Sequence, residues 1–385
     1  PAPREVLLAS MAKYQRVFAI ESGGTLLPKF VAILEGKPGK PAAVRAVIER
    51  ILNARLADGL MFFEADKKQP LGKANLAGIT FHEKLGSMEE KTQRLWHLSS
   101  TLGEIWSLTQ QELQHLQRAC LLAKADLVSA MVKEFPTLQG VVGKHYARDS
   151  GEPAAVAEAI EEHYLPLAGT SPKTLIGSAL AVLDKYDTLA SYFSIGIEPT
   201  GDQDPFGLRR AAQGIVEVAW KIRRPLALGS LFATWQRQTM LQFGKAEGAA
   251  RIHRYILERL YTFEWPAPKP AQDYIDAVLA GPCDDLVDVM ERIVSLRQLD
   301  GHPGLRKAAK VIERTRNILK GAPLRQPQVD PARLAEPPER KLWDVYASNH
   351  ERVERLAAER SYGEATTLFG ELFFEPLHEF FDRVL

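Results

Sequence analysis

Short apolar runs and one periodic stretch alternate over the first 75 residues. Four runs have the length of a strand: residues 6–8, 17–20, 30–34 and 60–63. Ser22-Gly23-Gly24 is a turn signal between the second and the third run. From Pro41 onward apolar residues recur at steps of three and four, which predicts a helix. Residues 1–75 are therefore predicted to form a small α/β segment.

Apolar positions at helical spacing dominate residues 76–200. One stripe consists of Leu113, Leu116, Cys120, Ala123, Leu127 and Met131. A second stripe consists of Val156, Ile160 and Tyr164. Such stripes are typical of helices buried on one side, and prolines between them end the helices because proline cannot continue the hydrogen-bond ladder. This region is predicted to be a helical domain.

Helical periodicity continues from residue 201 to the end, interrupted by proline-rich links. Asp204 is expected to cap a helix that begins at Pro205, because a proline at the first helical position loses no hydrogen bond. Prolines are dense in residues 266–270 and 321–338. We expect helical domains over residues 201–265 and 266–322, a linker over 323–338 and a small helical module over 339–385. The predicted fold class is mainly α.

The composition is that of a soluble globular protein. Hydrophobic residues make up 45% and charged residues 25% of the 385 residues. No stretch approaches the roughly 18 apolar residues that cross a bilayer, and the start lacks a secretory signal pattern. The expected location is therefore the cytoplasm. The first residue is Pro rather than Met, so we expect a processed start, a trimmed chain or a missing upstream region.

Charge and cysteines narrow the candidate chemistry. The 49 basic and 48 acidic side chains give a net charge of +1, so contact with a nucleic acid must come from local basic faces. Cys120 and Cys283 lack a Cys or His at metal-ligand spacing, so neither a disulfide framework nor a zinc site is predicted. A phosphate loop, a serine nucleophile elbow and a His-Glu-x-x-His helix are absent from the sequence.

His82, Asp126 and Asp184 are spaced like the ligands of a helical metal-dependent phosphohydrolase, and each is predicted in a helical context. That fold holds its metal ions with a His, a His-Asp pair and a final Asp. The residue before Asp126 is Ala125, where the pair needs histidine, and one His with two lone carboxylates binds a transition metal poorly. We therefore expect a structural group without metal; a working phosphohydrolase is the alternative.

Basic residues gather in three places. Arg306, Lys310 and Arg314 repeat every four residues and are predicted to line one face of a helix. The same helix also carries Lys307, Arg316 and Lys320. The second cluster consists of Arg209, Arg210, Lys221, Arg223 and Arg224. The third cluster consists of Lys67, Lys68 and Lys73. Cations at such spacing reach successive phosphates and predict salt-dependent RNA binding, whereas a solvated helix face is the alternative.

Aromatic residues are frequent in the module over residues 339–385. They are Trp343, Tyr346, Phe369, Phe373, Phe374, Phe380 and Phe381. Aromatic rings can stack on unpaired bases, but in a short helical unit so many rings are expected to form a core.

Several longer stretches, in this order along the chain, resemble the β subunit of the heterotetrameric bacterial glycyl-tRNA synthetase. They are residues 54–66, 81–87, 124–127, 134–140, 161–166, 184–189 and 199–210. The longest reads Ala-Arg-Leu-Ala-Asp-Gly-Leu-Met-Phe-Phe-Glu-Ala-Asp. The resemblance covers nearly the whole sequence. It implies that residues 77–200 are a degenerate HD-type domain, and that the last module is a truncated anticodon-binding domain whose signature matches residues 380–384.

The resemblance also implies how the work is divided. In that family the α subunit activates glycine with ATP and Mg, and the β subunit holds the tRNA. We therefore expect this chain to bind no cofactor and to have no catalytic residue of its own. Its expected partners are the α subunit and tRNA(Gly), and neither DNA nor a membrane; a helical scaffold that binds only protein is a further alternative. The family's β subunit extends upstream of Pro1 and past Leu385, so we expect a naturally shortened form or a fragment.

Overall fold

The computed structural model describes residues 3–15, 17–167, 169–199, 204–239, 247–320 and 329–384. Most of these residues are helical, and the named strands among them form two small antiparallel hairpins. The predicted fold class, mainly α, is confirmed. The chain divides into two compact units, Pro1–Arg259 and Leu260–Leu385. The six-part division expected from the sequence is finer than these units and stays a prediction.

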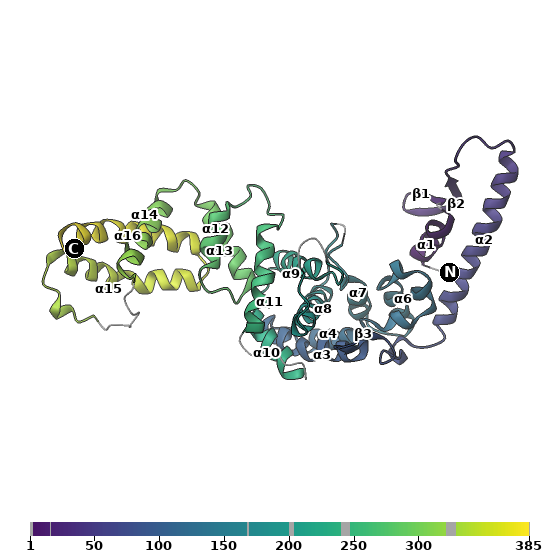
Figure 1. Ribbon diagram of the computed structural model, residues 1–385, viewed down its shortest axis with the longest axis horizontal. Helices are drawn as coiled ribbons and strands as arrows, with labels where there is room; N and C mark the ends of the chain where they lie inside the picture. The colour runs from purple at the N-terminus through teal and green to yellow at the C-terminus, as the bar shows by residue number, and fades with distance from the viewer. Residues whose placement is uncertain are drawn as a thin grey trace. The chain divides into compact units, whose positions relative to one another are not determined.

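The first unit begins with a hairpin and two helices (Figure 1). These elements are α1 (Arg4–Gln15), β1 (Val17–Ser22), β2 (Thr25–Ala32) and α2 (Pro41–Asp66). The strands pair antiparallel, with Phe18 opposite Val31. Helices α1 and α2 approach closely at Gly59, where a Cβ atom would lie 2.7 Å from Ser10 Oγ. The predicted α/β segment is therefore present.

Two of the four predicted strands are wrong. Residues 6–8 lie in α1 and residues 60–63 lie in α2. A short apolar run fits a buried helix face as well as a strand. Here Val6 and Phe63 are buried side chains of their helices, and helical hydrogen bonding runs through both segments. Residues 17–20 do lie in β1, and residues 30–32 of the third run form the end of β2, which already begins at Thr25.

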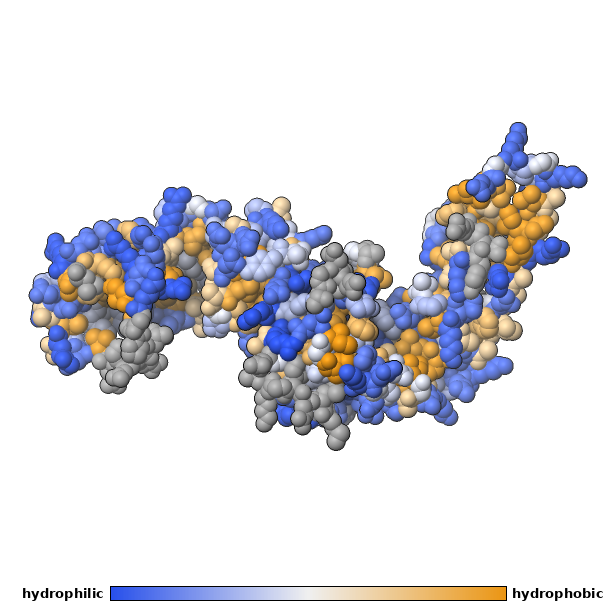
Figure 2. Space-filling model, in the orientation of Figure 1, coloured by the Kyte–Doolittle hydropathy of each residue, from blue (hydrophilic) through white to orange (hydrophobic). Residues whose placement is uncertain are grey.

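An apolar surface lies over this N-terminal segment. Figure 2 shows hydrophobic residues gathered where Figure 1 places α2 and the β1–β2 hairpin. The exposed apolar side chains here include Phe18, Val31, Ile33, Val47 and Met61, and Ile33 is 77% exposed. The buried cluster beneath is small and consists of Met11, Val17 and Leu52.

The rest of the first unit is a helical body around α8 (Leu175–Ser194). Its other α-helices are α3 (Met88–Ile105), α4 (Gln110–Leu122), α5 (Ala130–Glu134), α6 (Val141–Asp149), α7 (Ala154–Glu162), α9 (Leu208–Ile222), α10 (Leu228–Gln238) and α11 (Glu247–Leu257). A second hairpin consists of β3 (Thr80–His82) and β4 (Gly86–Ser87). Short 3₁₀-helices, labelled η, are η1 (Leu71–Lys73), η2 (Ala125–Val128) and η3 (Pro136–Leu138), and η4 (Glu258–Tyr261) follows α11. Helix α8 is buried over most of its length, and α3, α7 and α9 pack on it. This central helix therefore organises the residues of the candidate site.

The first predicted stripe is not one helix. Helix α4 ends at Leu122, and the chain passes through η2 before α5 begins. The break is stabilised by the carboxylate of Asp66, which accepts hydrogen bonds from Ala130 N and Met131 N at 2.9 Å each. Leu116, Cys120 and Met131 are nevertheless all fully buried, so the apolar period continues across the break. In the second stripe, α7 ends at Glu162, so Tyr164 lies beyond it.

Asp204 has the predicted capping role, but its helix begins later than expected. Its oxygens accept hydrogen bonds from Leu208 N at 2.7 Å and Arg209 N at 3.0 Å. Helix α9 starts at Leu208 and not at Pro205. Gly207 precedes the helix with φ of 68°, a left-handed conformation that suits glycine and lets the carboxylate reach past the turn.

The second unit contains α12 (Gln272–Leu279), α13 (Leu286–Gln298), α14 (Pro303–Ile318), η5 (Pro331–Arg333), α15 (Pro337–Ala358) and α16 (Tyr362–Arg383). Helix α16 packs on both α14 and α15. It approaches α14 at Gly370, where a Cβ atom would lie 2.4 Å from the carbonyl oxygen of Gly304. The helices after the proline-rich stretch therefore share a core with α14. Residues 321–328 of that stretch lie outside the described residues.

No helix in the described ranges is long and apolar enough to cross a membrane. Both cysteines are free thiols. Cys120 is fully buried in α4, whereas Cys283 is partly exposed just before α13.

Candidate functional site

His82, Asp126 and Asp184 lie in three different environments. His82 ends strand β3, so its predicted helical context is wrong. Its ring packs edge-on against Tyr192 and Phe206, with centroids 5.6 and 6.0 Å away. Asp126 is buried in η2, where its Oδ2 accepts a hydrogen bond from Gly140 N at 2.5 Å. Asp184 lies on α8 and pairs with lysines.

The ammonium group of Lys124 lies between His163 and Asp184. Lys124 Nζ is 2.7 Å from His163 Nε2 and 3.2 Å from Asp184 Oδ2. His163 Nδ1 is 2.7 Å from the carbonyl oxygen of Ile160, an acceptor, so Nδ1 carries the proton and Nε2 accepts from Lys124. Burial and the neighbouring Lys124 hold the pKa of His163 well below its usual value, which keeps the ring neutral. The three side chains come from or directly follow α4, α7 and α8.

A second buried carboxylate, Asp187, belongs to the same network. It accepts hydrogen bonds from Arg94 Nε at 2.6 Å, Lys91 Nζ at 3.0 Å and Trp235 Nε1 at 3.0 Å. Lys91 Nζ also lies 3.2 Å from Asp184 Oδ1, so it connects the two carboxylates. Burial opposes the charge on Asp187, but Arg94 and Lys91 hold its pKa below the usual value. These bonds join α3, α8 and α10.

Asp126 is the exception among the buried carboxylates. Burial raises its pKa to about 6, although hydrogen bonding to Gly140 N and the charge of Lys124 act against the rise. The α6 backbone packs closely against the Asp126 carboxylate, because a Cβ atom at Gly143 would lie 2.9 Å from Asp126 Oδ2. Asp126 therefore accepts a hydrogen bond that holds the turn at Gly140, and its carboxyl group titrates in mildly acidic solution.

The network does not support the phosphohydrolase alternative. Within the residues that the structure describes, no group of three or more His, Cys, Asp or Glu side chains is placed to hold a metal ion. Asp184 and Asp187 are neutralised by Lys91, Arg94 and Lys124. Through these ion pairs the two carboxylates of α8 hold neighbouring helices together.

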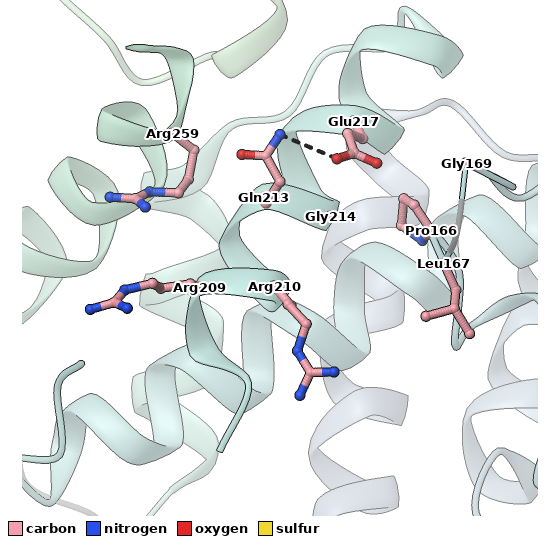
Figure 3. A pocket seen from close by; sticks show the side chains of 9 residues that line it. All are labelled: Pro166, Leu167, Gly169, Arg209, Arg210, Gln213, Gly214, Glu217 and Arg259. Atoms are coloured by element: carbon pink, nitrogen blue, oxygen red, sulfur yellow. Dashed lines mark hydrogen bonds between the residues drawn. The ribbon is translucent and has the colours of Figure 1, made fainter. Parts of the chain in front are cut away.

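A positively charged hollow lies at the N-terminal half of α9 (Figure 3). It has a volume of about 440 Å³ and is lined by Pro166, Leu167, Gly169, Arg209, Arg210, Gln213, Gly214, Glu217 and Arg259. Arg209 and Arg259 extend to the same side in Figure 3, whereas Arg210 extends in a different direction. The lining holds three arginines and one carboxylate, and Glu217 Oε1 accepts a hydrogen bond from Gln213 Nε2 at 3.2 Å. The hollow suits an anionic group.

The other cations of the second predicted cluster lie at the far end of α9. About 18 Å of helix separates Arg210 from residue 222, at about 1.5 Å per residue, so the five residues do not form one cluster. Lys221 Nζ donates to the carbonyl oxygen of Pro172 at 2.9 Å, and Arg224 donates to that of Trp106. The guanidinium of Arg223 lies 3.5 Å from the centroid of the Trp220 ring. These three cations hold the fold as well as carrying charge.

The predicted basic face on α14 is partly exposed. Arg306 and Lys310 are exposed, and Lys310 Nζ lies 2.9 Å from Glu313 Oε2. Arg314 instead lies against α16, with its guanidinium 5.4 Å from the centroid of the Phe381 ring. Lys307 Nζ lies 5.9 Å from the Phe374 ring, and Arg316 and Lys320 are exposed. In the third cluster, Lys67 pairs with Asp149 at 3.2 Å.

Most of the aromatic residues of the last helices pack together, as expected. Phe373 is buried with Val311 and Leu377, and Phe369, Phe374, Phe380 and Phe381 pack against this group. Tyr346 is 45% exposed and stacks on His350, with centroids 4.7 Å apart.

Comparison with known proteins gives one consistent family. The family model described as "Glycyl-tRNA synthetase beta subunit" matches residues 2–280. The chain belongs to this family. Its relatives include the glycine–tRNA ligase β subunits of Dichelobacter nodosus (strain VCS1703A), 35% identical over 392 residues, and of Bacillus subtilis (strain 168), 33% identical over 390 residues. The one from Geobacter sulfurreducens (strain ATCC 51573 / DSM 12127 / PCA) is 36% identical over 395 residues.

These alignments cover the whole chain but only part of each relative. The covered share is 56% of the Dichelobacter nodosus and Geobacter sulfurreducens proteins and 55% of the Bacillus subtilis protein. The chain therefore spans about half the length of the relatives it matches. The resemblance to the glycyl-tRNA synthetase β subunit is confirmed.

Sequence reasoning missed three residues that the structure makes important. Lys124 and His163 stood inside the stretches that resemble the family, but no spacing rule joined them, because they come together only across α4, α7 and α8. Arg259 lies about 50 residues after Arg209 and joins it only through the fold. A single cation next to an apolar helical stripe is a sequence signal that could have pointed to Lys124.

Proposed function

We propose that this chain is the tRNA-holding part of a glycine–tRNA ligase β subunit and that it carries no aminoacylation site of its own. The family assignment and the arginine-lined hollow on α9 support this proposal. Arg209, Arg210 and Arg259 present guanidinium groups, which bind phosphate oxygens through paired N–H donors. The net charge of +1 is too small for a global attraction, so the phosphate contacts are local.

The remaining parts of the reaction belong to the partner. Activation of glycine with ATP and Mg takes place on the α subunit, and the two kinds of subunit form a heterotetramer in the cytoplasm. Within this chain, the exposed cations of α14 add a second contact with RNA phosphates. Residues 77–200 act as an HD-type domain without metal, and the last helices as an anticodon-binding-like module. The chain takes no DNA.

The experiment is a binding titration of the purified chain with tRNA(Gly) at several salt concentrations. If each arginine of the hollow neutralises one phosphate, the three together contribute about −2.7 to the slope of the logarithm of affinity against the logarithm of salt, and the α14 cations add to it. The contribution of the hollow alone lowers affinity about 40-fold between about 50 and 200 mM salt. Replacing Arg209 and Arg210 by Gln is expected to make the slope less steep by about 1.8.

A matched double variant provides the control. Arg45 and Arg50 are exposed on α2, away from the hollow-lining residues along the chain, and their replacement by Gln removes the same charge. This control is expected to leave the salt slope unchanged. Binding that is insensitive to salt, or equally tight to an unrelated duplex DNA, contradicts the proposal. Association with the α subunit in the absence of any affinity for tRNA would favour the scaffold alternative instead.

A further inference from the structure

Lys124 Nζ lies between a histidine nitrogen and a carboxylate oxygen. An imidazole nitrogen, His163 Nε2, and a carboxylate oxygen, Asp184 Oδ2, both point at it, at 2.7 and 3.2 Å. Neutral imidazole and carboxylate are the donors that divalent transition cations prefer. The face of the Tyr164 ring lies 4.2 Å from the same Nζ and adds attraction for a cation.

The protein also orients these donors as a metal site would. The Nδ1 atom of His163 is fixed by the carbonyl oxygen of Ile160, which leaves Nε2 with its lone pair directed at Lys124. A backbone carbonyl on the other ring nitrogen is the usual way of fixing a ligating histidine. The second oxygen of Asp184 is held by Lys91 at 3.2 Å, so Oδ2 alone serves Lys124. His163, Lys124 and Lys91 are buried, and the side chain of Asp184 is 14% exposed.

We propose that the Lys124 ammonium is a built-in replacement for a divalent cation, and that this one side chain keeps metal out of the His163–Asp184 cluster. The sequence had assigned the loss of metal binding to Ala125, where a histidine is missing. The structure adds a second and more direct cause, because a positive charge already lies between the donors. Removing the ammonium leaves one imidazole nitrogen and one carboxylate oxygen facing the vacated space; both are donors that Co²⁺ and Zn²⁺ accept, and water would complete the coordination. The proposal does not depend on the tRNA-binding function.

The test replaces Lys124 by alanine in the full chain and titrates it with Co²⁺, followed by equilibrium dialysis and visible absorption. Alanine frees the space and removes the charge. The matched control is Lys124→Met, which removes the charge but fills most of the space. We expect about one Co²⁺ per chain for Lys124→Ala, bound at least about tenfold more tightly than by the wild type or Lys124→Met. Adding Asp184→Asn to Lys124→Ala is expected to abolish this binding.

Metal binding is also expected to stabilise the variant, because a ligand that binds only the folded state raises the unfolding temperature. A Lys124→Ala chain that folds only when Co²⁺ is present would therefore support the proposal. Three results would overturn it: a folded Lys124→Ala that binds no Co²⁺, one that stays unfolded with and without the metal, or binding that survives Asp184→Asn.

Discussion

Replacing Asp187 with alanine removes the carboxylate on which two buried cations and one indole depend. Asp187 is fully buried, and its partners Lys91 and Arg94 are 2% and 7% exposed. After the substitution both cations stay in the core without this carboxylate, and Trp235 Nε1 loses its acceptor. Removal of one partner of a buried ion pair costs about 3–5 kcal/mol, because the remaining charge is not solvated. We take about 4 kcal/mol as the expected loss.

The assay is pulse proteolysis after equilibration in urea, which follows the first unit by the fragments released from it. With an m-value of about 3 kcal/mol per M, the expected shift of the urea midpoint is about 1.3 M to lower urea. The control is Asp58→Ala on α2, where an exposed pair with Arg55 at 3.6 Å is lost and the effect is at most about 0.5 kcal/mol. A shift for Asp187→Ala no larger than that of the control would refute the account of a network that binds α3, α8 and α10.

Three further predictions follow from single sites. Burial raises the pKa of Asp126 from 3.8 to about 6, so the folded state keeps a proton that the unfolded state has released. As pH rises from about 4 to about 6, the wild type should therefore lose stability relative to Asp126→Asn. Urea midpoints measured across this pH range will test this. Gly214→Ala should destabilise the first unit by about 1–3 kcal/mol, since its Cβ would lie 2.7 Å from a lysine carbon of α8, whereas Gly363→Ala in α16 meets no atom within 4 Å and should be neutral or stabilising by thermal melting. Cys120 is fully buried, and burial raises the pKa of its thiol. A thiol reagent should therefore modify Cys283 in the native chain and Cys120 only after unfolding. Rapid labelling of both cysteines would contradict the buried position of Cys120 in α4.

Local patterns in the sequence carried much of the fold. The periodic run after Pro41 became α2, the runs around Ser22-Gly23-Gly24 became the β1–β2 hairpin, and Asp204 caps α9. Each of these depends on residues within one or two turns, where spacing and turn chemistry decide the conformation. The family could also be identified from the sequence, because its stretches occur in order along the whole chain.

The errors share a cause. Residues 6–8 and 60–63 are apolar runs too short to show a period, so whether they form strands or helices depended on the surfaces they bury. His82 stood at a suggestive spacing, but the turn that follows it placed it on a strand beside Tyr192 and Phe206. The division of α9 into two charged ends also needed the structure, since its helix bounds decide which arginines are neighbours.

The sequence by itself determined that this chain is a mainly helical member of the glycyl-tRNA synthetase β-subunit family and that Arg209 and Arg210 are candidate phosphate contacts. Only the tertiary structure decided that Lys124 lies between His163 and Asp184, and that Arg259 joins the hollow. The physical reason is distance along the chain. Burial, ion pairing and pKa shifts arise from groups that meet when helices pack, and no local period encodes those meetings.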